Sequence, residues 1–464
     1  MAPVGRCVLN KALTDYYRCP DDFADFTLAG DLSTESGYFR FGHNTICYGR
    51  CTRGDGTRLF TDPTYDALEH TTIDASVPCL PFDPMQVVDN LRCERYPVRA
   101  DGPWKTFTAW EAVRQAYYFA RPLMPVKVRR HFQKFDLKDW DKISFPRWPV
   151  DRTVDQVLEK LLKLSLKARG VSRLPFIWFW PEGHSSCTIM THDVEESAGL
   201  EFCSQLMDID DAAGIKASFQ IVPEKRYTVS PNVLQTFRDR GFEVNVQDLN
   251  HDGHLYQDRE KFLRRAEKIN RYLLKFGSSG FRAGSMYRNT DWYDAFDFSF
   301  DMSVPNVAHL ESQRGGCCTV MPYFIGKVLE LPLTTTQDYS LFHILDDYSI
   351  SLWKRQIDLI LEKHGLVSFV IHPDYVIEER ARNTYQALLD YLCKLRSEGK
   401  TWIALSGEVD RWWRARSQMK LVSEGGKWTI EGAGRERARV AYAILNGDEM
   451  VYSLPESTCK EAVV

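Results

Sequence analysis

The chain has 464 residues, 44% hydrophobic and 26% charged, which is the composition of a globular protein too long for one ordinary core. A formal net charge of −4, with no block of like charges, excludes the basic surface of a nucleic-acid-binding protein. We expect a cytoplasmic protein without a membrane span, because the chain has no apolar signal-peptide core, no bilayer-length apolar run, and twelve scattered cysteines that argue against a disulfide scaffold.

Residues 1–125 alternate short β-like runs with turn formers, which predicts an N-terminal β-rich domain of unknown role. Its candidate strands include 37–42, 45–49 and 57–60. Residues 126–184 form a helical connector, in which Asp151–Ala168 carries one apolar stripe at helical spacing.

Residues 185–415 alternate strands with amphipathic stretches, which favours parallel βα units. Seven or eight such units predict an α/β fold with a closed or nearly closed barrel. The candidate strands are 187–191, 216–222, 242–246, 280–282, 298–303, 328–333, 366–371 and 402–405, and the clearest helices are 259–276, 351–364 and 381–398. Residues 416–464 form a small C-terminal β appendage with two alternating runs.

The first strand of this barrel region ends in a cluster of acidic side chains. The apolar run from Cys187 is followed by Asp193 and Glu195, where α/β folds place their chemistry. By itself the pattern also fits a helix start, with Asp193 as the capping residue and Glu195 in the first turn.

Polar side chains at the ends of the other strands favour the chemical interpretation. The segment 247–254, which contains Gln247, His251 and His254, follows one strand end, and Arg282, Asp301 and His372 lie at or near the ends of later strands. In a barrel, all these strand ends meet at the same rim. Carboxylates, histidines and an arginine together are what metal-assisted hydrolysis requires: a metal polarises a carbonyl, a base deprotonates water, and an acid protonates the leaving group.

Four motifs in this order resemble those of the polysaccharide deacetylase family, which includes chitooligosaccharide and peptidoglycan deacetylases (carbohydrate esterase family four). They are Thr191-His-Asp-Val-Glu195, the stretch 241–255 around His251, Phe281-Arg-Ala-Gly284, and Leu366-Val-Ser-Phe-Val-Ile-His-Pro373. The resemblance covers roughly residues 185–415, about half of the chain, and implies the distorted (β/α)7–8 barrel of that family.

The resemblance also implies a role for each matching residue. Asp193 would be the general base, and Arg282 would keep it ionised. His372 would protonate the departing amine, with Asp301 orienting it and raising its pKa. Glu195 and His251 would bind a divalent metal, with zinc the expected ion.

One departure from the family pattern concerns the metal. The two metal histidines of the family are spaced i, i+4, and the position four before His251 is Gln247, whose amide oxygen is a poor zinc ligand. His254, three residues further on, offers a replacement. The metal set is therefore Glu195, His251 and His254; or Glu195, Gln247 and His251 with weak affinity; or absent.

We expect a metal-dependent hydrolase of non-peptide amide bonds that removes an N-acyl group, acetyl above all, from an amino sugar or glycan precursor. Its partner would be that carbohydrate. Two alternatives remain: a carbohydrate-binding protein whose barrel has lost its metal, suggested by Gln247, and a hydrolase of a non-sugar amide, because a fold does not fix a substrate.

Overall fold

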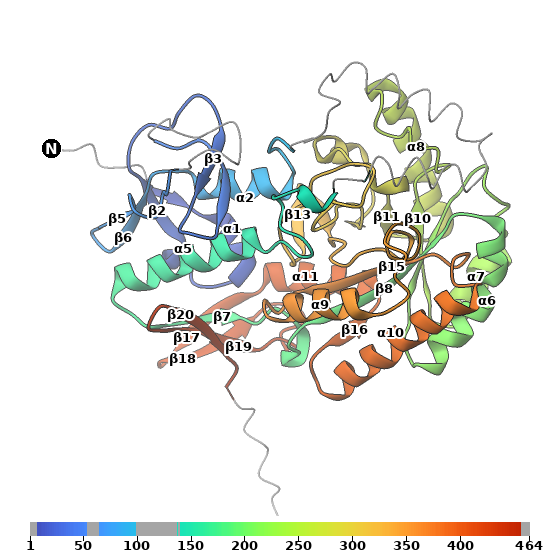
Figure 1. Cartoon of the computed structure of the whole chain (residues 1–464). Coiled ribbons are helices and arrows are strands. Elements are labelled where there is room, and N and C mark those ends of the chain that lie inside the picture. The colour runs from blue at the N-terminus through green and yellow to red at the C-terminus, as the bar shows by residue number, and fades with distance from the viewer. Residues whose placement is uncertain (1–6, 53–64, 99–136, 138–139, 456–464) are drawn as a thin grey trace, which may run out of the picture. The chain divides into compact units, whose positions relative to one another are not determined.

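The computed structural model describes residues 7–52, 65–98, 137 and 140–455 (Figure 1). The candidate strand 57–60 lies outside these residues. The chain divides into two compact units. Unit 1 comprises Met1–Tyr96, Thr153–Ser186 and Arg411–Val464, and unit 2 comprises Pro97–Arg152 and Cys187–Asp410.

Unit 2 is built on one curled, mostly parallel sheet (Figure 1). Its strand order is β13-β14-β12-β11-β10-β9-β8-β15, and β16 pairs with the beginning of β8. The strands are β8 (Cys187–Val194), β9 (Ser218–Ile221), β10 (Glu243–Gln247), β11 (Gly280–Arg282), β12 (Phe300–Asp301), β13 (Tyr323–Ile325), β14 (Val328–Glu330), β15 (Leu366–Ile371) and β16 (Trp402–Ala404). All eight residues of β8 are buried, as expected for a central parallel strand covered on both faces.

Helices pack against the outer face of this sheet, as Figure 1 shows for α6 to α10. They are α6 (Ser197–Ala212), α7 (Pro231–Asp239), α8 (Arg259–Phe276), α9 (Ser351–Leu361) and α10 (Glu379–Ser397). The ends of α8 are set by local chemistry, because the Asp258 side chain accepts from the backbone of Lys261 and Gly277 takes the left-handed conformation that ends the helix. Shorter helical turns are 140–142, 284–286, 290–295 and the π-helical turn Ser340–Ile344.

Side chains rather than a hydrogen-bonded ladder bring the sheet round from β14 to β15. Thr334 Oγ1 lies 2.7 Å from the carbonyl oxygen of Leu366 and 2.9 Å from the amide nitrogen of Ser368. Thr335 Oγ1 donates to the carbonyl oxygen of Ser368 at 2.7 Å. The segment after β14 therefore lies beside β15. The expected mixed α/β fold is present, with a curled sheet that forms a half-barrel.

In the part of unit 1 that the structure describes, small sheets combine with helices. Its strands are β1 (Cys7–Leu9), β2 (Asp25–Leu28), β3 (Gly37–Arg40), β4 (Ile46–Gly49), β5 (Thr72–Asp74), β6 (Val77–Leu80), β7 (Arg173–Ile177), β17 (Lys420–Glu424), β18 (Lys427–Glu431), β19 (Val440–Asn446) and β20 (Glu449–Ser453). Its helices are α1 (Lys11–Tyr17), α2 (Pro84–Arg92) and α5 (Thr153–Arg169), and α11 (Ser406–Gln418) carries the chain from unit 2 into unit 1. Short helical turns lie at 21–24 and 181–183.

The structure divides the chain differently from the four consecutive domains 1–125, 126–184, 185–415 and 416–464. β19, in the expected C-terminal appendage, pairs antiparallel with β7, in the expected connector. These segments join the N-terminal region in unit 1. Patterns of hydrophobicity identify a strand but not its distant partner. The sequence-based prediction therefore assigned these two strands to different domains.

Within the described residues, no helix combines the length and the apolar character needed to cross a membrane.

Candidate functional site

Two carboxylates at the C-terminal end of β8 form the centre of the site. Asp193 Oδ1 accepts from Arg282 Nη1 at 2.5 Å, and Asp193 Oδ2 accepts from Gln247 Nε2 at 3.1 Å. The Asp193 side chain is almost fully buried, whereas that of Glu195 is 19% exposed. Glu195 therefore lies at the open side of the pair.

Three side-chain nitrogens converge on Oε1 of Glu195. Gln247 Nε2 lies at 3.1 Å, His251 Nε2 at 2.8 Å and His372 Nε2 at 3.5 Å. Burial alone would raise the pKa of Glu195, but the two histidines more than offset it and hold the pKa well below its ordinary value. Glu195 is ionised at neutral pH.

Arg282 is fixed behind Asp193 by neighbouring strands. Its Nε donates to the carbonyl oxygen of Met302, and its Nη1 donates to Thr191 Oγ1 at 2.7 Å as well as to Asp193. The guanidinium is fully buried. The sequence brought Arg282 and Asp193 to the same rim, and the structure places them in direct contact.

His372 is held by Asp338, not by Asp301. Asp338 accepts from the His372 backbone nitrogen at 2.7 Å, and its Oδ1 lies 2.6 Å from His372 Nδ1. Burial would lower the pKa of His372, but the carboxylates of Asp338 and Glu195 more than offset it and raise the pKa well above its ordinary value. An acid paired at Nδ1 directs Nε2 toward the rim.

Asp301 lies elsewhere in the wall of the barrel. It accepts from Tyr293 through Oδ2 and from Ser303 through Oδ1, both at 2.6 Å. Burial and the neighbouring charge of Asp301 raise the pKa of Glu330 well above its ordinary value. The expectation that Asp301 orients His372 is therefore wrong. Asp301 and Asp338 both follow strands, and the fold shows that Asp338 is the one that contacts the histidine.

The loop after β10 presents His251 in a constrained conformation. Asp248 and His251 both have positive φ angles, 49° and 52°, which are uncommon for residues with side chains and cluster at functional sites. Arg226 Nη2 donates to the His251 carbonyl oxygen at 2.8 Å and lies 3.3 Å from its Nδ1, while Nη1 donates to Glu196. Gly284 packs so closely that a Cβ there would lie 2.9 Å from His251 Cδ2.

The donors at this rim fit a divalent metal. Among the described residues, ligand atoms of Asp193, Glu195 and His372 lie within 4.8 Å of one another. His251 Nε2 is buried and lies 2.8 Å from Glu195 Oε1. A carboxylate and an imidazole this close together are donors that suit ligation of a common ion.

Gln247 and His254, the other two expected metal ligands, do not present a ligand atom to this group of donors. Gln247 turns its Nε2 toward the carboxylates, and its Oε1 is buried without a hydrogen bond. His254 lies beside Asp252, whose side chain accepts from the His254 backbone nitrogen at 2.9 Å, and is not a member of the grouped donors. The amide therefore occupies the position between the carboxylates.

Sequence reasoning assigned no role to three contributors to the site, Asp338, Arg226 and Gly284. The segment 337–342, which contains Asp338, was expected to line the pocket because it follows a strand end, but its contact with His372 was not predicted. Arg226 and Gly284 act through contacts that no sequence spacing indicates.

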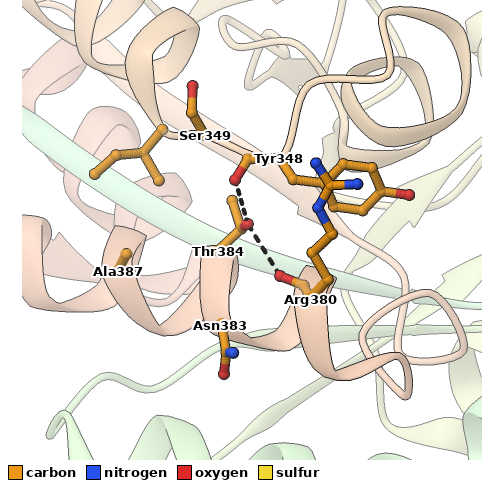
Figure 2. A pocket seen from close by; sticks show the side chains of 7 residues that line it. Tyr348, Ser349, Arg380, Asn383, Thr384 and Ala387 are labelled. Carbon is orange, nitrogen blue, oxygen red and sulfur yellow. Dashed lines mark hydrogen bonds between the residues drawn. The ribbon is translucent and has the colours of Figure 1, made fainter.

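A shallow cavity of about 270 Å³ lies apart from these residues, between the start of α9 and α10 (Figure 2). In Figure 2 the guanidinium of Arg380 lies against the Tyr348 ring, 3.9 Å from its centroid, and Thr384 donates to the Tyr348 carbonyl oxygen. None of the candidate site residues lines this cavity.

Comparison with known proteins identifies similar structures but no similar sequence: no protein-family model matches, and no curated protein matches. A solved structure from Mycobacterium smegmatis, named as a polysaccharide deacetylase, is 15% identical with a TM-score of 0.42, covering 54% of this chain and 98% of its own. The allantoinase PuuE is 13% identical with a TM-score of 0.41, over 51% and 92% of the two chains. The peptidoglycan deacetylase PdaC of Bacillus subtilis is 13% identical with a TM-score of 0.32, over 50% and 93%.

The resemblance found in the motifs is confirmed to this extent. Polysaccharide and peptidoglycan deacetylases recur among the matched structures, over about half of this chain. At these TM-scores the likeness carries no argument about activity, which has to come from the side chains themselves.

Proposed function

We propose that unit 2 is a hydrolase that removes an N-acyl group, acetyl above all, from an amino sugar or glycan precursor. One observation carries the proposal. A carboxylate held by a buried arginine and a histidine backed by a carboxylate lie with their ligand atoms within 4.8 Å of each other and of Glu195. This arrangement supplies a base and an acid around one point, as amide hydrolysis needs.

Asp193 is proposed as the base that takes a proton from the attacking water. Arg282 donates to Oδ1 of Asp193 at 2.5 Å, which holds the carboxylate in a fixed position at the rim. His372 is proposed as the acid that protonates the leaving amine. Its raised pKa keeps the imidazole protonated at neutral pH, and Asp338 at Nδ1 leaves Nε2 to deliver the proton.

Glu195 and His251 would hold a divalent metal at this rim, and zinc suits carboxylate and imidazole donors. Such an ion would polarise the acyl carbonyl and stabilise the charge that develops on its oxygen. Gln247 would join the set only with its amide turned so that Oε1 faces the carboxylates. We leave His254 out of the proposed set, because it lies beside Asp252.

Acetate release from a panel of N-acetylated sugars, with and without added zinc or cobalt, tests the proposal. Wild-type protein should release acetate, and both Asp193→Asn and His372→Ala should reduce the rate at least ~100-fold. Tyr348→Phe, in the cavity away from the site, serves as the control. No release from any sugar with either metal would overturn the assignment, and release from simple amides alone would reassign the substrate class.

A second function is favoured by a specific contact. Gln247 Nε2 donates to both Asp193 and Glu195, so the carboxylates have a partner where a cation would otherwise balance them. This arrangement suits a carbohydrate-binding protein whose barrel no longer binds metal. Elemental analysis separates the two functions, because about one bound metal per chain, lost on His251→Ala, is expected only of the hydrolase.

A further inference from the structure

Three aromatic rings form a cluster beside His372. The Tyr375 ring packs against the imidazole of His372, with 4.6 Å between ring centroids. The rings of His343 and Tyr339 lie 4.9 Å and 5.8 Å from Tyr375, and 5.4 Å from each other. We call Tyr339, His343 and Tyr375 the aromatic wall.

The same carboxylate that holds His372 fixes the start of this wall. Asp338 Oδ1 accepts from the backbone nitrogen of Tyr339 at 2.7 Å and lies 2.6 Å from His372 Nδ1. Tyr375 is tied to His372 by a turn, since its backbone nitrogen donates to the His372 carbonyl oxygen at 3.1 Å. The wall is therefore set at a fixed place relative to the proposed acid.

Tyr339 and His343 lie at the beginning and within the π-helical turn Ser340–Ile344. π-helical turns are rare and are frequently found at functional sites. The turn places the rings of Tyr339 and His343 against Tyr375.

Exposure distinguishes the wall from the residues behind it. His372 is 4% exposed and Asp338 is fully buried, whereas all three residues of the wall are half-buried. His372 already makes two hydrogen bonds to the carboxylate of Asp338, so its orientation does not require three rings. Glu195, 3.5 Å from His372 Nε2, is also partly exposed, so His372 has the wall on its ring and the carboxylate at its Nε2.

We propose that the aromatic wall is the subsite that binds the pyranose ring carrying the scissile amide; this rests on the proposed function. A pyranose presents an apolar face of C–H groups and a rim of hydroxyls. Aromatic rings cover such a face, and the phenol and imidazole polar atoms can bond to the rim. An acyclic amide would gain nothing from the wall.

Binding measured without turnover tests the subsite. In full-length Asp193→Asn protein, titration with N-acetylglucosamine and its disaccharide, followed by calorimetry or NMR, gives a Kd. Adding Tyr339→Ala or the double change Tyr339→Ala/His343→Ala should weaken the Kd ~10-fold or more. Tyr348→Phe, a change to a half-buried tyrosine of the same segment that lies outside the wall, should leave the Kd unchanged.

Folding and turnover controls make each result decisive. Tyr339→Leu keeps apolar bulk without the ring, so a matching loss of affinity in this variant, at an unchanged melting temperature, assigns the effect to the ring. In otherwise wild-type protein, Tyr339→Leu should raise KM for N-acetylglucosamine ~10-fold and change kcat less than ~3-fold.

Unchanged Kd values in both Tyr339 variants, or no binding of either sugar to the Asp193→Asn parent, would overturn the subsite. A failure of the proposed function looks different, because wild-type protein would then bind the sugar through the wall and release no acetate.

Discussion

The side-chain nitrogen of Gln247 lies 3.1 Å from Oε1 of Glu195. The same nitrogen lies 3.1 Å from Oδ2 of Asp193, so one amide bridges the two carboxylates of the site. An amide donates hydrogen bonds but brings no net charge and no imidazole lone pair. Metal affinity at this rim therefore depends on whether Gln247 stays in place, turns or is replaced.

Replacing this amide with an imidazole should strengthen metal binding. We expect Gln247→His to tighten zinc binding ~10-fold or more, because a nitrogen ligand would replace a donor at a position beside Glu195. Chelator competition and elemental analysis of the purified protein measure the change. Gln247→Leu, which removes the donor and adds no ligand, is the control. Equal zinc content in wild type and Gln247→His would show that position 247 does not face the metal.

The close approach of Gly284 gives a second prediction, about His251. A Cβ at position 284 would lie 2.7 Å from Asp248 Oδ2 and 2.9 Å from His251 Cδ2. Gly284→Ala should therefore displace the loop, lower the free energy of unfolding by about 1–3 kcal/mol and reduce metal retention.

Gly30→Ala is the matched control, since the nearest atom to its Cβ is 3.9 Å away and no strained φ is involved. Thermal unfolding and metal content of the two variants are compared. A Gly284→Ala protein as stable and as metal-rich as wild type would mean that the loop adjusts freely.

The parts of the fold that the sequence predicted well are those determined locally. The helix 259–276 has the predicted ends because Asp258 caps one and Gly277 terminates the other. The strands 280–282 and 366–371 also have their predicted bounds, and Asp193, Arg282 and His372 meet because parallel strands end at one rim.

The parts of the fold that the sequence did not predict depend on contacts between residues far apart in the chain. The pairing of β7 with β19 joins two of the three segments that make up unit 1, and no local pattern specifies it. The acid beside His372 is Asp338 rather than Asp301, because the segment past β14 turns toward β15. Strand ends identify which residues share a rim, but not which of two acids reaches a given side chain.

The contact between Asp338 and His372 gives a prediction for the pH profile. The carboxylate of Asp338 helps to raise the pKa of His372, and an acid catalyst works only below its own pKa. Asp338→Asn should therefore move the alkaline limb of kcat/KM to lower pH and lower kcat ~100-fold or more. The pH dependence of acetate release measures both effects.

Asp301→Asn is the comparison that separates the two acids. Asp301 bonds to Tyr293 and Ser303, so its replacement should leave the alkaline limb in place. A shift caused by Asp301→Asn but not by Asp338→Asn would contradict the orientation of His372 described above.

Asp374 gives a prediction about stability rather than catalysis. Its Oδ1 is buried without a hydrogen bond, and burial raises the pKa of this carboxyl to about 6. A folded-state pKa above the unfolded value means that the protonated form stabilises the fold below about pH 4, and that this contribution is lost as the pH rises through about 6. At pH 8 the charged carboxylate therefore costs stability.

Asp374→Asn removes that charge at nearly constant volume. We expect a higher melting temperature than wild type at pH 8, corresponding to about 1–2 kcal/mol once partial solvent exposure is allowed for, and little difference at pH 4. Asp390→Asn, on the exposed face of α10, controls for the change in net charge. Thermal unfolding of all three proteins across this pH range decides the point: an Asp374→Asn protein that gains stability equally at pH 4 and pH 8 would show that the gain does not come from the buried charge.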